Sequence, residues 1–192
     1  MKYVGGYVLP VVAFLLVTFG SGPPPRAENH LCKQQFALCT SAPCIPEPGN
    51  PKVAICTCDV QDGASLSTVD CDTVKPSSDA NGVRTVYSQF ALNQFQQGKK
   101  GLKCASGTPW TWCLNKPCTV DPANPKKAIC ACDVLRTGEW MTAGGNCNTK
   151  SCNTAYWSGA SLNDVSDATN FLMKSLNIKK SPLNWCGQTG AK

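Results

Sequence analysis

Residues 39–60 read CTSAPCIPEPGNPKVAICTCDV, and residues 113–134 read CLNKPCTVDPANPKKAICACDV. When Cys39 is aligned with Cys113 without gaps, 13 of these 22 positions are identical, and four of the identical positions are cysteines. Identity at one fixed spacing is typical of an internal repeat, in which each copy forms one structural unit. The two stretches therefore predict two similar modules in one chain.

Each stretch predicts a β-hairpin. Pro-Gly-Asn-Pro at 48–51 and Pro-Ala-Asn-Pro at 122–125 are turn sequences, because Pro fixes φ and Gly or Asn tolerates unusual φ values. The residues that follow, 52–60 and 126–134, have the character of strands and contain Cys-x-Cys near their ends. Side chains alternate along a strand, so both cysteines of each pair face one side, where Cys44 and a more distant cysteine are candidate partners. The pairing stays open, since six cysteines allow many connectivities.

A helix is expected near the end of each copy. Residues 161–177 carry apolar side chains at near-helical spacing, and Ser161, Asp164 and Asp167 suit a helix N-terminus. The counterpart in the first copy is shorter, at 88–97, with Gly98 as its terminator. We therefore predict a small disulfide-rich α+β fold of two tandem repeat modules, each a cysteine-pinned β-hairpin region followed by one short helix.

The beginning of the chain differs from the rest. Lys2 is followed by an apolar run over residues 7–19, and then by Gly, Ser and Pro residues, which is the pattern of a signal peptide. The run is shorter than the roughly 20 residues that a membrane-spanning helix needs. We expect cleavage after Ala27 or nearer Gly22, and a secreted or periplasmic protein with no stable membrane span after processing. An uncleaved N-terminal anchor is the competing interpretation.

The predicted organisation has three parts. Residues 1–27 are the signal peptide, residues 28–103 the first Cys-rich repeat module, and residues 104–192 the second. Lys-Lys pairs at 99–100 and 179–180 lie at matching places in the two tails. No long linker separates the modules.

The cysteine content fits an exported protein. All 14 cysteines follow the predicted leader, and their share of the remaining chain is that of a disulfide scaffold. Thiols oxidise and stay paired outside the cytosol, and an even number leaves none over. The cysteines predicted to form seven disulfides are Cys32, Cys39, Cys44, Cys56, Cys58, Cys71, Cys104, Cys113, Cys118, Cys130, Cys132, Cys147, Cys152 and Cys186.

Two other functions are alternatives to the one we expect, which is that of a non-enzymatic binding protein. Each copy contains Cys-x4-Cys-x11-Cys-x-Cys, whose four ligands could hold tetrahedral zinc, so a Cys-thiolate metal-binding or redox protein is the alternative. In an exported chain disulfides are the simpler interpretation, and we expect no metal and no cofactor. The single histidine, His30, lies near the predicted mature N-terminus, where chain ends are loose, so we expect no catalytic residues built on it. A small carboxylate-dependent hydrolase ranks last, because no spacing favours a carboxylate pair.

All five tryptophans lie in the predicted second module. Trp110 and Trp112 share one face in an extended segment, because side chains alternate along a strand. Large rings fill the core of small modules, but exposed tryptophans are also favoured at binding surfaces. The candidates for a ligand platform are Trp110, Trp112, Trp140 and Trp157.

The charge indicates no nucleic-acid partner. The net charge is +6, and loss of Lys2 and Arg26 leaves 16 − 12 = +4. The lysines occur in pairs rather than in a tract, and few lie near aromatic residues, so nucleic-acid binding is not expected. We expect a monomeric, non-enzymatic binding protein whose partner is an extracellular or periplasmic protein or a glycan.

Overall fold

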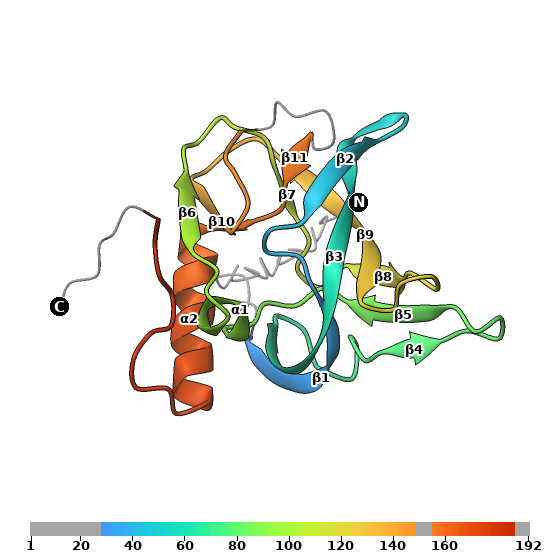
Figure 1. The fold of residues 1–192 in the computed structure, drawn as a ribbon, viewed down its shortest axis with the longest axis horizontal. Helices are drawn as coiled ribbons and strands as arrows, with labels where there is room; N and C mark the ends of the chain where they lie inside the picture. Colours follow the sequence, from blue (N-terminus) through green and yellow to red (C-terminus); the bar gives the residue numbers. More distant parts are fainter. Residues whose placement is uncertain (1–27, 149–154, 187–192) are drawn as a thin grey trace, which may run out of the picture.

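The computed structural model describes residues 28–148 and 155–186, whose fold is shown in Figure 1. β-strands take 46% of the structure and helices 12%. The predicted α+β fold, with a short helix after each hairpin, is therefore wrong, because the described part of the chain is mostly β-sheet. Its two helices are α1 (Asn93–Gln96) and α2 (Leu162–Ser175).

The helix expected at 88–97 is reduced to the four residues of α1. The Gln89 backbone N–H donates to the Ala37 carbonyl at 3.0 Å, and Phe90 and Leu66 exchange backbone hydrogen bonds of 3.3 and 2.7 Å. A backbone N–H or C=O that is hydrogen-bonded to a strand cannot also form the i to i−4 hydrogen bond of a helix. Long-range pairing therefore overrides the local helical pattern before α1.

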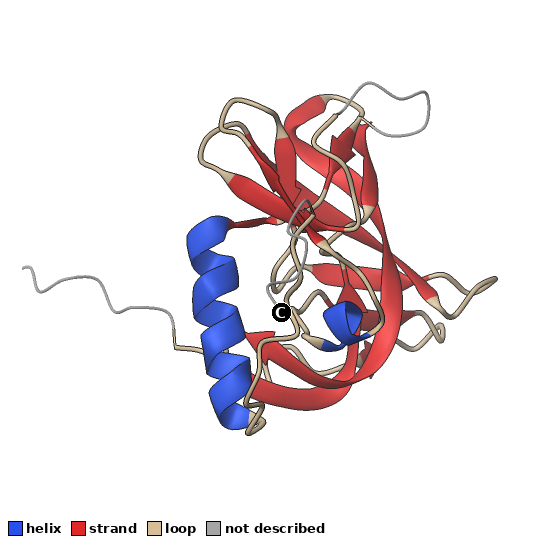
Figure 2. Ribbon diagram, turned by 60° about the vertical axis from the view of Figure 1, so that its left-hand side comes forward, coloured by secondary structure: helices blue, strands red, loops and turns tan. Residues whose placement is uncertain are grey.

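The helix expected at 161–177 is present as α2. Ser161 is its N-cap, and the Ser161 side chain accepts a hydrogen bond from the Asp164 backbone N–H at 3.2 Å. After its end, Asn177 takes a positive φ of 53°, which is common just beyond a helix C-terminus. Figure 2 shows α2 standing along one side of the strands. The buried residues of α2 are Val165, Ala168, Thr169 and Leu172.

Nine strands form one large sheet. These strands are β1 (His30–Leu38), β2 (Pro43–Glu47), β3 (Asn50–Ser67), β4 (Ser77–Ser78), β5 (Arg84–Tyr87), β7 (Trp110–Trp112), β8 (Pro117–Val120), β9 (Lys127–Leu135) and β11 (Tyr156–Trp157). Their order is β11-β2-β3-β9-β8-β5-β4, with β1 also paired to β3 and β7 to β9. The sheet therefore takes strands from both predicted modules.

Three strands form a second, smaller sheet. They are β6 (Gly101–Cys104), β10 (Trp140–Ala143) and β12 (Ala160–Ser161), in the order β12-β10-β6. The predicted boundary between the modules, at 103/104, falls inside β6. β12 runs directly into α2, so the small sheet fixes the position at which that helix begins.

The two predicted hairpins are present and pair with each other. β2 pairs with β3, and β8 with β9, in each case across one of the two Pro-rich turns. β3 and β9 then pair antiparallel, with Cys56 opposite Cys130. Since these two cysteines are equivalent positions of the two similar stretches, the hairpins are related by an approximate two-fold rotation about this point.

Among the described residues, six disulfides join twelve cysteines. The twelve cysteines form two sets of six, one at 32–71 and one at 104–147. In each set the first cysteine bonds to the sixth, the second to the fifth and the third to the fourth, so the bridges are nested. Cys152 lies outside the described residues, and Cys186 is exposed with no disulfide to a described cysteine. The seventh predicted bridge is therefore untested. The pairs are Cys32–Cys71, Cys39–Cys58, Cys44–Cys56, Cys104–Cys147, Cys113–Cys132 and Cys118–Cys130.

The central four bridges form the core where the hairpins meet. Cys39 Sγ lies 3.4 Å from Cys130 Sγ, and Cys58 Sγ lies at the same distance from it. Both cysteines of each Cys-x-Cys pair are buried here, as strand alternation predicts. A second cluster, which includes Phe95 and Met141, packs against α2. The candidate functional site lies where these two clusters meet.

Candidate functional site

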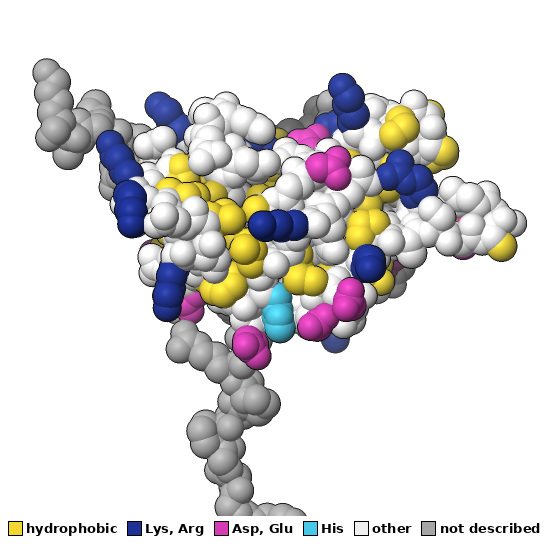
Figure 3. Space-filling view, turned by 90° about the horizontal axis from the view of Figure 1, so that it is seen from below, with side chains coloured by type: hydrophobic (Ala, Val, Ile, Leu, Met, Phe, Trp, Pro, Cys, Tyr) yellow, Lys and Arg dark blue, Asp and Glu magenta, His cyan; other side chains and the backbone are white. Residues whose placement is uncertain are grey.

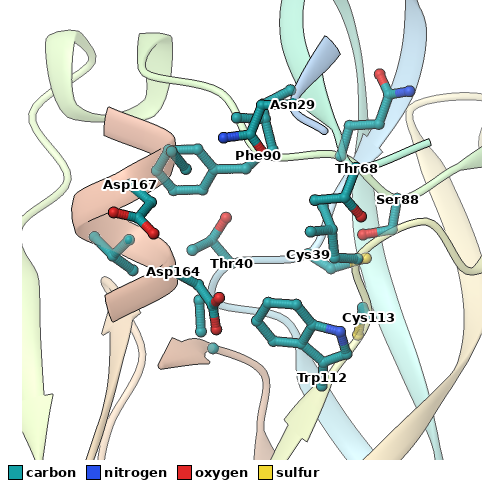
Figure 4. A pocket seen from close by; sticks show the side chains of 17 residues that line it. Asn29, Cys39, Thr40, Thr68, Ser88, Phe90, Trp112, Cys113, Asp164 and Asp167 are labelled. Carbon is teal, nitrogen blue, oxygen red and sulfur yellow. The ribbon is translucent and has the colours of Figure 1, made fainter. Parts of the chain in front are cut away.

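A pocket of about 190 Å³ opens between the first two turns of α2 and the residues before α1 (Figure 4). We call it the α2 pocket. Its walls combine backbone segments that are far apart in the chain, around residues 39–40, 66–68, 88–90, 112–114 and 159–168. Both predicted modules contribute walls, so neither hairpin could form it alone.

The floor of the α2 pocket follows the approximate two-fold relation. Cys39 and Cys113 both line it, and they are equivalent positions in the two similar stretches. The next residues, Thr40 and Leu114, are also equivalent and also line it. Because Cys39 and Cys113 each belong to a buried disulfide, the floor is covalently tied to both hairpins.

An aromatic ring lines the lower side of the α2 pocket in Figure 4. This ring is Trp112, at the end of β7, which is half-buried and lies 6.1 Å edge-on from Trp110. Trp110 in turn stacks on Trp140, with ring centroids 5.7 Å apart and planes 8° apart. Packing of this kind holds the Trp112 ring in one orientation. Phe90 lies at the opposite side of the pocket and is 7% exposed.

The four tryptophans considered for a platform have different surroundings. Trp110 is 2% exposed and Trp140 is fully buried, so these rings belong to the core. Trp157 is half-buried and packs against the same cluster. Only Trp112 among the four lines the α2 pocket. The structure therefore brings the four rings together in one cluster, but of the four only Trp112 lines the α2 pocket, where a ligand could reach it.

Two carboxylates enter the α2 pocket from the helix. Figure 4 shows Asp164 and Asp167 pointing from α2 into the same hollow that Trp112 borders. Asp164 lies in the first turn, where its carboxylate accepts a hydrogen bond from the Ser161 hydroxyl. A negative side chain is favourable at this end of a helix, so the cap also fixes where the carboxylate lies.

Hydroxyl groups line the side opposite the helix. Thr40, Thr68 and Ser88 supply them. Neighbouring amides orient two of these hydroxyls: Gln94 Nε2 donates to Thr40 Oγ1 at 3.2 Å, and Asn115 Nδ2 donates to Thr68 Oγ1 at 2.7 Å. Oriented hydroxyls can bind a polar ligand group without first giving up free rotation.

The α2 pocket is acidic within a basic protein. Its two charged lining residues are Asp164 and Asp167, and no Lys, Arg or His is among the described residues that line it. The chain as a whole carries a net charge of +6. Figure 3 shows Lys and Arg side chains spread over the lower face rather than gathered in one patch. The charged residues that line the pocket are therefore negative, although the chain as a whole is positive.

Other candidate residues from the sequence lie outside the α2 pocket. His30 begins β1 and is half-buried, and Figure 3 shows the histidine on the lower face beside acidic side chains. The two aspartates that follow Cys-x-Cys form ion pairs: Asp59 with Lys127 at 2.6 Å, and Asp133 with Lys116 at 2.8 Å. Both carboxylates lie within strands, and neither lines the α2 pocket.

The cysteines that could hold a metal are oxidised. One group of three sulfurs within 4.8 Å of one another belongs to Cys39, Cys58 and Cys113, and similar groups involve their neighbours. All of these sulfurs belong to disulfides. A disulfide sulfur carries no thiolate charge, and the thiolate is the form that binds zinc. The spacing that resembles a metal site therefore positions disulfides.

Sequence reasoning missed the carboxylates of the α2 pocket. The sequence indicates Asp164 and Asp167 only as partners of the helix dipole. One feature of the sequence could have pointed to them. Asp164 and Asp167 lie one helical turn apart, so they share a face of the helix, next to its apolar stripe. Nothing local predicts that residues 88–90 lie across from them, since that arrangement depends on pairing with β1 and β3.

Comparison with known proteins adds no assignment. No protein-family model, curated protein sequence or solved structure matches the chain. The many disulfides suggest an oxidising, extracellular-type environment. Within residues 28–148 and 155–186, no helix is long and apolar enough to cross a membrane.

Proposed function

We propose that the protein is an exported, non-enzymatic binding protein that holds a protruding group of a protein or glycan ligand in the α2 pocket. One observation carries this proposal: the pocket joins an aromatic ring, oriented hydroxyls and two carboxylates in one hollow. Apolar walls with a few convergent polar groups are the usual composition of ligand sites. Export rests on the leader at 1–27, and the disulfides support it.

The size of the α2 pocket limits what it can hold. Its volume of about 190 Å³ is below the roughly 300–1,000 Å³ of pockets that enclose a whole drug-sized molecule. A single ring or a single side chain fits such a space. We therefore expect the pocket to bind the end or the branch of a larger ligand, whose remainder lies on the surrounding surface.

A carboxylate-dependent hydrolase is the second candidate, because two carboxylates do share this pocket. Glycosidase carboxylates flank the scissile bond from both sides, roughly 5–10 Å apart. Asp164 and Asp167 come from successive turns of one helix and line one wall. Both are exposed, whereas a catalytic acid is commonly kept protonated by an apolar environment. This arrangement favours binding over hydrolysis.

The test is a screen of the secreted protein on a glycan array and a peptide array. Trp112→Ala removes the ring of the α2 pocket, and Ile45→Ala is the control, since Ile45 is 54% exposed on β2 and does not line the pocket. We expect hits that disappear with Trp112→Ala and persist with Ile45→Ala. Hits that survive Trp112→Ala, or no hits at all, overturn the proposal.

Two further readouts separate the alternatives. Thermal unfolding and intact mass of Trp112→Ala establish that its six described disulfides have formed, so that lost binding is not lost folding. Recovery of the bound ligand with its mass unchanged supports binding. Cleaved ligand, with cleavage abolished by Asp164→Asn, supports the hydrolase instead.

A further inference from the structure

We propose that the α2 pocket binds the basic side chain of a polypeptide: the ammonium of a lysine, or the guanidinium of an arginine, together with its apolar stem. This inference rests on the proposed function and names the chemistry of its ligand. Three features of the pocket carry it, namely its charge, its aromatic ring and its apolar walls.

The charge of the pocket selects a cation. Asp164 and Asp167 are its charged lining residues, and no described lining residue has a positive side chain. A carboxylate accepts hydrogen bonds at both oxygens, so Asp164 can bind a ligand while it also accepts from Ser161. Charge-assisted hydrogen bonds of this kind are about twice as strong as neutral ones. An anionic ligand would be repelled at the same place.

The aromatic ring lies beside the carboxylate. In Figure 4 the Asp164 carboxylate and the Trp112 ring border the same corner of the hollow. The negative face of an indole attracts ammonium and guanidinium groups, and tryptophan is the best of the aromatic residues in this role. The chain itself contains such a pair, since Lys103 Nζ lies 4.9 Å from the Trp185 ring centroid. A cation in the α2 pocket would meet a ring and a carboxylate together.

The remaining walls fit an alkyl stem better than a sugar. Leu66, Leu114 and Val165 line the pocket, together with the ring of Phe90. A lysine or arginine side chain buries its methylene groups along such surfaces and keeps its charged end at polar groups. A sugar ring carries hydroxyls around its whole edge, and those that face these apolar walls would lose their hydrogen bonds to water. The hydroxyl of Thr40 can accept one of the remaining N–H groups.

The experiment is an NMR titration of the full exported protein at millimolar ligand. The probe is Nα-acetyl-lysine methylamide, and its Nε-acetylated form is the matched probe without charge. Glucosamine and N-acetylglucosamine serve as the charged and the neutral sugar. We expect the lysine probe to shift the Trp112 indole N–H resonance, to bind about tenfold or more tightly than its acetylated form, and to weaken with added salt.

Matched variants locate the charge that the probe meets. Asp164→Asn removes one negative charge from the α2 pocket. Asp72→Asn makes the same change at an exposed residue that does not line it. We expect Asp164→Asn and Trp112→Ala each to weaken binding of the lysine probe by about tenfold. Asp72→Asn should leave the affinity within about twofold of the parent, because a charge that is exposed to solvent outside the pocket is screened.

The outcomes distinguish this inference from the function on which it rests. Equal binding of the two lysine probes, or no effect of Asp164→Asn, overturns the inference. Glucosamine binding more tightly than the lysine probe assigns the site to a glycan, which also overturns it. Trp112-dependent binding of N-acetylglucosamine alone overturns the cationic ligand and leaves the proposed function standing. If no probe shifts a pocket resonance and both arrays are blank, the proposed function fails as well.

Discussion

Cys56 in β3 lies directly opposite Cys130 in β9, and the two cysteines occupy the same position in the two similar stretches of sequence. The register continues symmetrically on both sides, with Ala54 opposite Cys132 and Cys58 opposite Ala128. Each Cys-x-Cys strand is therefore the partner of its own counterpart. This pairing merges the two hairpins into one sheet and gathers the sulfurs of the four central bridges at one point.

The first prediction is that disulfide mapping recovers the nested pairing. Because neighbouring bridges lie in contact, with Cys39 Sγ only 3.4 Å from Cys130 Sγ, mispaired forms are geometrically close to the native one. We nevertheless expect peptide mapping under non-reducing, acidic conditions to recover the native pairs, among them Cys39–Cys58 and Cys113–Cys132. A linkage between Cys39 and Cys130 as the main species would contradict the structure.

Equal stabilisation by equivalent bridges is the second prediction. Cys44–Cys56 and Cys118–Cys130 each have a sequence separation of 12, and all four residues are at most 1% exposed. Since the loops have the same length, replacing either pair with alanines should lower the free energy of unfolding by about 3 kcal/mol.

The two double variants are compared by urea denaturation. We expect their free energies of unfolding to agree within about 0.5 kcal/mol, because the two bridges close loops of the same length. A difference above about 1.5 kcal/mol would show that the two hairpins are not energetically equivalent.

The third prediction is that Trp110 contributes mainly to stability and Trp112 mainly to binding. Trp110 is 2% exposed and stacks on Trp140, so Trp110→Ala should destabilise the fold by about 3–5 kcal/mol. Trp112 is half-buried at the α2 pocket, so Trp112→Ala should cost less stability and affect binding. Thermal unfolding of both variants checks this order. Equal loss of stability would place Trp112 in the core and remove it from the proposed site.

The hairpins could be predicted because their signals are local. The turn sequences and the alternation of Cys-x-Cys lie within about ten residues of each other. The Ser161 cap of α2 is equally local, and it is predictable for the same reason. These features depend little on the rest of the chain.

The sheet and the α2 pocket could not be predicted because they depend on distant contacts. Phe90 has the spacing of a helix residue, but its backbone pairs with Leu66 in β3, much earlier in the chain. The pocket places Asp164 across from this segment, at a separation in sequence that no periodic pattern encodes. Hydrophobic periodicity shows which face of a helix or strand is buried, but it does not show which other element packs against that face.

A steric requirement at Gly159 is the fourth prediction. Gly159 lines the α2 pocket between β11 and β12, and a Cβ atom there would lie 2.3 Å from the Met141 carbonyl oxygen and 2.7 Å from the Trp140 ring. Neither group can move freely, because both belong to β10 and are buried. Gly159→Ala should therefore lower the free energy of unfolding by about 1–3 kcal/mol and weaken ligand binding in the pocket.

Gly107→Ala is the control for this effect. Gly107 has a positive φ of 95° and open space around its Cβ position, so alanine there introduces backbone strain without a clash. We expect Gly107→Ala to cost about 1 kcal/mol and to leave binding unchanged. Chemical denaturation and the lysine titration measure both quantities. If Gly159→Ala is as stable as the parent, β12 can move away from β10, and the start of α2 is not held by the small sheet.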